Sequence, residues 1–91
     1  MNDEKLLTRS VENSEQLVYQ LISSEAVCLR ERDMETAYSI LVARTDGESV
    51  LDSALAYDVS RREERGRELM RELWQSAAEP CEVKEAVSEL L

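Results

Sequence analysis

The feature that most constrains this chain is the span between its clearest turn, Thr45-Asp46-Gly47, and its only proline, Pro80. Apolar residues within that span recur at three- and four-residue steps, which is typical of a helix packed against another helix. Thr45 and Glu48 also fit a capping box at the start of such a helix. The sequence therefore predicts one long helix over 48–77, whose packing seam would be Leu51, Leu55, Val59, Arg62, Gly66, Leu69 and Leu73.

The same spacing predicts further helices over 3–31, 34–44 and 81–90. Residues 38–43, Tyr-Ser-Ile-Leu-Val-Ala, also have strand character, so a short strand is the competing interpretation there. We prefer a helix because a single strand would have nothing to pair with. Proline disfavours the helical conformation of the residue before it, so we expect the long helix to end before Pro80 and the last helix to begin near it.

Composition points to the same class of fold. The chain has 91 residues, which is the size of one domain, with only two glycines and one proline. So few chain breakers leave little room for the turns of a β-sandwich or barrel. We therefore predict a single all-α domain over 1–91, a bundle of three to four helices centred on the long third helix.

The net charge of −9 restricts the possible partners. An acidic surface repels phosphate, which argues against direct binding to nucleic acid or to an anionic membrane. Cys28 and Cys81 lie far apart, and the first residues do not resemble a secretory signal, so we expect reduced thiols in a cytoplasmic protein. No apolar run approaches the length of a membrane span.

Several kinds of chemistry are excluded by the residues present. The chain has no histidine, which removes Ser-His-Asp and Cys-His catalysis and histidine-based metal sites. Its two glycines are separate, so there is no glycine-rich phosphate loop, and two distant cysteines cannot form a zinc site alone. The carboxylates fall at helix-surface spacings rather than as a catalytic pair. We predict a protein that is not an enzyme, with no catalytic, cofactor-binding or metal-binding residues.

The remaining class is a protein-binding module, such as an adaptor, a chaperone or an inhibitor, that binds through the apolar helix seam. Arg62 and Gly66 interrupt that seam. Either Gly66 lets a bulky neighbour pack closely while Arg62 extends outward, or the pair forms a docking notch for a carboxylate and an apolar side chain. The predicted contact residues are Arg62, Gly66, Met70, Trp74, Leu90 and Leu91.

Two alternative functions stay open. The acidic charge would also suit a nucleic-acid mimic of the phage anti-defence type, which blocks a DNA- or RNA-binding protein, and the seam would suit the subunit of a homo-oligomer such as a homodimer. In each case the partner is a protein, for which a basic surface would be complementary. The apolar stripe of the last helix either closes the bundle or belongs to the partner's surface.

Overall fold

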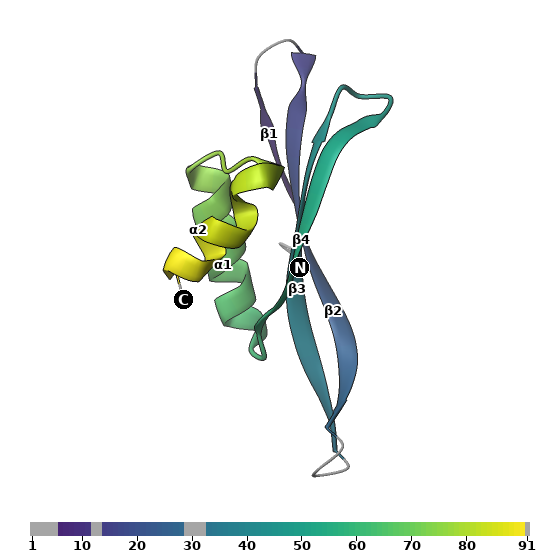
Figure 1. Ribbon diagram of the computed structural model, residues 1–91, viewed down its shortest axis with the longest axis vertical. Coiled ribbons are helices and arrows are strands. Elements are labelled where there is room, and N and C mark those ends of the chain that lie inside the picture. The colour runs from purple at the N-terminus through teal and green to yellow at the C-terminus, as the bar shows by residue number, and fades with distance from the viewer. Residues whose placement is uncertain (1–5, 12–13, 29–32, 91) are drawn as a thin grey trace.

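The chain forms a four-stranded antiparallel sheet with two helices on one of its faces (Figure 1). This architecture comes from a computed structural model, which describes residues 6–11, 14–28 and 33–90. The strands pair in the order β1-β2-β3-β4, so each strand lies beside its neighbour in the sequence. The elements are β1 (Leu6–Ser10), β2 (Gln16–Cys28), β3 (Asp33–Thr45), β4 (Val50–Ser60), α1 (Glu63–Gln75), the 3₁₀ turn η2 (Pro80–Glu82) and α2 (Val83–Leu90).

The prediction of an all-α bundle is therefore wrong. The regions predicted as helices over 3–31 and 34–44 instead form β1, β2, β3 and the connection between β1 and β2, and 3–5, 12–13 and 29–31 lie outside the described residues. The first half of the predicted helix over 48–77 is β4, and α1 begins only at Glu63. Around 81–90 the chain is helical, as η2 and α2. The strand interpretation of 38–43 is the correct one, because β2 and β4 supply the partners that an isolated strand would lack.

The core lies between the sheet and the two helices. Alternate residues of a strand point to opposite faces, and Leu17, Tyr19 and Leu21 of β2 all point toward the helices, with at most 4% of each exposed. β3 adds Ile40 and Val42 to the same core. Burying one such side chain contributes about 1.5–3 kcal/mol, so this layer supplies most of the fold's stability. The helices contribute Leu69, Met70, Leu73, Val83 and Val87.

Gly66 sets how closely α1 approaches the sheet. A Cβ atom at this position would lie 2.9 Å from Cδ1 of Leu21 and 3.4 Å from Cβ of Tyr38. Because glycine has no such atom, the helix backbone rests directly on β2 and β3. The interpretation of Gly66 as a position that admits a bulky neighbour agrees with this geometry, and the neighbour is Leu21.

The C-terminal end of α1 is fixed by its own backbone and by β1. Ala77 adopts a positive φ of 52°, and the Ala78 amide donates to the Leu73 carbonyl, which is the Schellman ending of a helix. The Arg9 guanidinium donates to the carbonyl oxygens of Trp74 and Gln75 at 2.9 and 3.2 Å. A cation at a helix C-terminus is favourable because the last carbonyls are otherwise unpaired and partly negative.

The Asp46-Gly47 turn joins β3 to β4 rather than starting a helix. The Asp46 carboxylate accepts the amides of Glu48 and Ser49 at 2.9 and 2.8 Å, and Gly47 has a φ of +98°, which favours glycine. These backbone hydrogen bonds hold the pKa of Asp46 below its ordinary value. The turn therefore fixes the hairpin that carries the second edge strand.

Candidate protein-docking face

The face of the sheet opposite the helices is not covered by any helix or strand that the structure describes (Figure 1). Strand alternation assigns to it the residues between those of the core. We call this surface the open face. Its described side chains are Leu6, Thr8, Ser10, Gln16, Val18, Gln20, Ile22, Ala37, Ser39, Leu41, Ala43, Thr45, Ser53 and Leu55.

Strand register arranges the open face in rows that cross the sheet. One row runs over all four strands as Leu6, Gln20, Leu41 and Leu55. The adjacent row consists of smaller side chains, namely Thr8, Val18, Ala43 and Ser53. A row dominated by leucine therefore lies beside a row of small residues.

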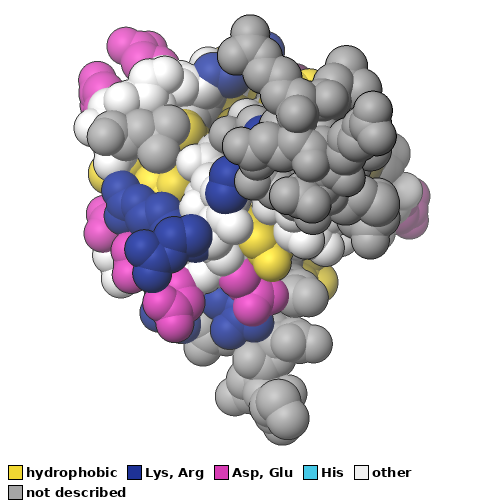
Figure 2. All heavy atoms as spheres, turned by 90° about the horizontal axis from the view of Figure 1, so that it is seen from below, with side chains coloured by type: hydrophobic (Ala, Val, Ile, Leu, Met, Phe, Trp, Pro, Cys, Tyr) yellow, Lys and Arg dark blue, Asp and Glu magenta, His cyan; other side chains and the backbone are white. Residues whose placement is uncertain are grey.

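None of the described side chains on the open face is charged, although the chain has 20 acidic and 11 basic residues. The charged side chains that the structure describes lie on the helices, in the turns and connections, and at the ends of the face that the helices cover, where Arg9, Arg44 and Asp52 sit. Figure 2 shows basic and acidic side chains next to one another over the helical side of the molecule. Among the described side chains, charge is thus segregated from this face of the sheet.

The apolar surface continues to both edges of the sheet. Among the described residues, the large hydrophobic side chains that are most exposed all lie on β1 or β4, the two edge strands. They are Leu6, Val50, Leu51 and Tyr57, at 56, 62, 48 and 79% exposure. Contiguous exposed apolar surface on a small domain marks an interaction site more often than isolated apolar residues do. On the open face itself Leu41 and Leu55 are partly exposed, whereas the small residues Ala37, Ser39 and Ala43 are buried at 5–7% exposure. The apolar surface is therefore made by the larger side chains of the open face and by its edges.

A shallow groove of about 280 Å³ lies where β4 meets α2. Leu55, Tyr57 and Val87 line it together with Lys84. It extends the apolar surface around the β4 edge.

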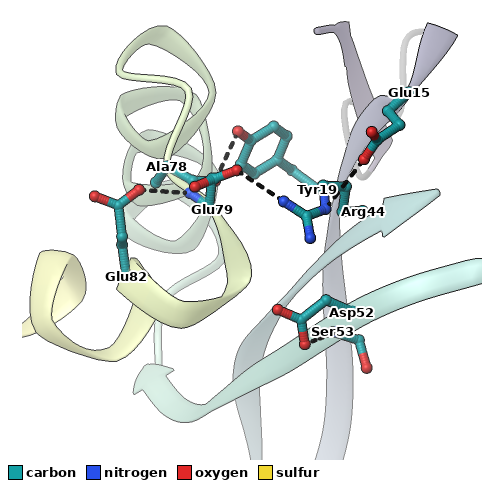
Figure 3. Close-up of polar contacts among 8 residues, drawn as sticks. All are labelled: Glu15, Tyr19, Arg44, Asp52, Ser53, Ala78, Glu79 and Glu82. Carbon is teal, nitrogen blue, oxygen red and sulfur yellow. Dashed lines mark hydrogen bonds and ion pairs between the residues drawn. The ribbon is translucent and has the colours of Figure 1, made fainter. Parts of the chain in front are cut away.

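Polar groups cluster on the covered face, where they attach the helices to the sheet (Figure 3). The Tyr19 hydroxyl donates to the Ala78 carbonyl oxygen at 3.0 Å, and burial raises the pKa of Tyr19 to about 12. Arg44 pairs with Glu79 and Glu15, each at 3.2 Å, which links β3 to the segment before η2 and to the β1–β2 connection. The contact from Arg44 Nε to Glu15 is an ion pair without hydrogen-bond geometry. These groups are occupied in holding the fold.

The described residues contain no group of three or more metal-ligating side chains that could hold an ion. Within the same part of the chain, no helix combines the length and the apolar character that crossing a membrane requires.

The structure disperses the predicted contact residues. Gly66 and Met70 are buried in the protein's own core, and Leu90 packs against that core from α2. Arg62 is exposed just before α1 begins. Leu91 lies outside the described residues.

Trp74 is half-buried against β1. Its indole N–H donates to the Thr8 carbonyl oxygen at 2.8 Å, and the Arg9 guanidinium lies 5.8 Å from the ring centroid. The aromatic ring therefore has an intramolecular role. Contact of any of the six predicted residues with a partner stays a prediction, and they do not form one surface.

The residues of the open face were missed because their strands were interpreted as helices. Leu41 was assigned to the apolar face of a short helix, and Leu55 to the long seam. One signal in the sequence does indicate strands, since Asp-Gly between two apolar runs favours a hairpin.

Comparison with known proteins does not assign a function, because no family model, no curated protein and no solved structure matches the chain.

Proposed function

We propose that this chain is a non-enzymatic protein-binding domain that docks onto another protein through the open face of its sheet. The observation that supports this most directly is a face whose described side chains are all uncharged, crossed by a row of Leu6, Gln20, Leu41 and Leu55, on a chain with a net charge of −9. A surface that only had to remain in water would carry its share of those charges.

Docking at this face would be driven by burial of apolar side chains. Each Å² of apolar surface removed from water contributes about 25 cal/mol, and no charged group on the described part of the face would have to be desolvated. Glutamine, threonine and serine side chains between the leucines can donate and accept hydrogen bonds, which gives such an interface its specificity. The helices hold the sheet from behind, so little ordering would be needed on binding.

The geometry gives less support to the other functions. A nucleic-acid mimic needs a continuous negative stripe, whereas Arg65–Glu68 and Arg67–Glu63 pairs alternate along α1. An uncharged face also gives a basic partner no advantage. The proposal places the domain in a reducing compartment such as the cytoplasm, because Cys81 is an exposed free thiol.

Site-specific photo-cross-linking in living cells tests this proposal. A photoreactive phenylalanine would replace Gln20, at the centre of the open face, or Gln75, on the helical side; both side chains are exposed. We expect position 20 to give discrete protein adducts at a yield at least about tenfold above position 75, since only the first would face a partner.

Equal adduct yields at the two positions, or none at position 20, would contradict the proposal. Circular dichroism of both purified variants provides the control, because each must keep the spectrum of the unmodified protein for its adducts to be compared.

A further inference from the structure

We infer that the occupant of the open face is a second copy of this chain, packed face to face about a two-fold axis. This inference rests on the proposed docking function of the face and names its partner. It would produce a dimer of four layers, with the two sheets inside and the helices outside.

Charge is the first argument for a second copy. Two chains of net charge −9 repel each other wherever their carboxylates approach. The open face is the surface on which the described parts of two copies can meet without bringing any charged side chain into contact. Stacked sheets lie about 10 Å apart, so the two helical layers would be roughly 30 Å from each other, well beyond the Debye length of about 8 Å at physiological salt.

Shape is the second argument. Two twisted sheets pack face to face at an angle of about 30°, with the side chains of one layer fitting between those of the other. On the open face the row of Leu41 and Leu55 lies directly beside the row of Ala43 and Ser53. A two-fold axis between the rows would set the leucines of each copy over the small residues of the other, since in such an interface every contact occurs twice.

The size of the face is the third argument. Three strands spaced about 4.8 Å apart over the eight residues of β2 from 16 to 23, with β1 beside five of these residues, cover most of an area of roughly 20 by 25 Å in projection. That is on the order of 500 Å² for each copy, and the relief of the side chains increases it further. The total for a dimer therefore reaches the roughly 1,000 Å² that a specific interface needs.

Sedimentation equilibrium of the purified chain over a range of concentrations tests the inference. We expect twice the mass of one chain, with dissociation on dilution. Because the interface is uncharged while the remaining surface is acidic, we expect added salt to strengthen the dimer, whereas a dimer held by ion pairs would weaken.

Two matched substitutions locate the interface. Gln20→Glu adds one carboxylate of nearly the same shape to the open face, and Gln75→Glu adds the same charge to the helical side. In a two-fold dimer the first change occurs on both copies, so we expect the dissociation constant to rise at least about tenfold. Gln75→Glu should leave it within about twofold, and both variants should keep the parent circular dichroism spectrum.

A monomer at every concentration would overturn the inference, and so would a dimer unaffected by Gln20→Glu. The cross-linking experiment then separates the two claims. Adducts at position 20 with a mass other than two chains would leave the docking function standing with a different partner. A monomer without adducts at position 20 would remove both.

Discussion

The two faces of this sheet are both apolar at their centres but differ at their margins. On the covered face, Tyr19 and Val42 are completely buried beneath the helices. Beyond the helices the same face becomes charged, with Arg9, Arg44 and Asp52 in the outer positions. The open face shows no such change, because its described side chains stay uncharged from one edge strand to the other.

The charged side chains of the covered face lie at its margin, where the contact with the helices ends and solvent begins. Arg9 binds the carbonyls at the end of α1, and Arg44 joins Glu79 to Glu15. These charged side chains are paired at the margin of the interface between the sheet and its own helices. The described part of the open face has apolar rows without a border of this kind, as expected if the partner that covers it also provides the border.

Two neighbouring residues of β3 give the strongest test of the difference between the covered face and the open face. Val42 points into the core and Leu41 onto the open face. Val42→Asp would bury a carboxylate without a partner, which costs several kcal/mol, so we expect this variant not to fold. Leu41→Asp should fold and should fail to dimerise. Far-UV circular dichroism with urea titration, followed by sedimentation of whatever folds, measures both effects.

If Leu41→Asp unfolds as completely as Val42→Asp, the two faces are equally part of the core and the distinction between them is lost. Leu41→Ala provides a milder variant for the same position. It removes apolar area without adding charge, so it should weaken the dimer while keeping the fold.

A second pair of substitutions compares added volume on the two faces. Gly66→Val would place a branched side chain where even a Cβ meets Leu21 at 2.9 Å. Overpacking of this kind costs about 1–3 kcal/mol, and we expect about 2 kcal/mol after the small gain in helix propensity. Ser53→Val adds volume to the open face at an exposed position, where β-branched residues suit a strand. We expect it to change the monomer by less than about 0.5 kcal/mol in urea unfolding.

An effect of Gly66→Val no larger than that of Ser53→Val would mean that the backbone of α1 does not rest directly on the sheet. Met70, in the same helix and fully buried, offers an independent check. Met70→Ala should cost about 2–5 kcal/mol if that layer is packed.

The same two-sided apolar pattern explains why the sequence predicted helices. A strand with one solvent-exposed face alternates apolar and polar residues. In this chain, by contrast, consecutive apolar residues fall on both faces of β2 and β3, as in Leu17-Val18-Tyr19 and Leu41-Val42-Ala43. Such runs imitate the broad stripe of a buried helix. Only the last part of the predicted helix over 48–77 and most of the predicted helix over 81–90 are helical, as α1 and as η2 with α2, and both helices pack one face on the sheet and expose the other. The helical period of their apolar residues could therefore be recognised in the sequence.

The candidate site could not be predicted from the sequence for a related reason. Leu6, Gln20, Leu41 and Leu55 come from four strands and form a row only through strand register. Register follows from the turns and from the apolar pattern of paired strands, and neither could be used once these segments were interpreted as helices. The absence of histidine and of glycine-rich loops could be seen in the sequence, and it limited the chemistry without locating a surface.

The smallest expected effect concerns two tyrosines, Tyr19 in the covered layer and Tyr57 on the exposed edge strand β4. Tyr19→Phe removes the hydroxyl that donates to Ala78 in the covered layer, and we expect a loss of about 1–2 kcal/mol at pH 7 in urea unfolding. Tyr57→Phe removes a hydroxyl from a side chain that is 79% exposed, and should change stability by less than about 0.5 kcal/mol.

The pH dependence of unfolding separates a buried phenol from a packing effect. Burial raises the pKa of Tyr19 from 10.0 to about 12 in the folded state, so the unfolded chain loses this proton first as the pH rises. Stability should therefore fall between about pH 10 and pH 12 in the parent, and Tyr19→Phe should remove that component of the slope. Parallel curves for parent and variant over this range would show that Tyr19 ionises equally well in both states, and that the covered face is as open to water as the other.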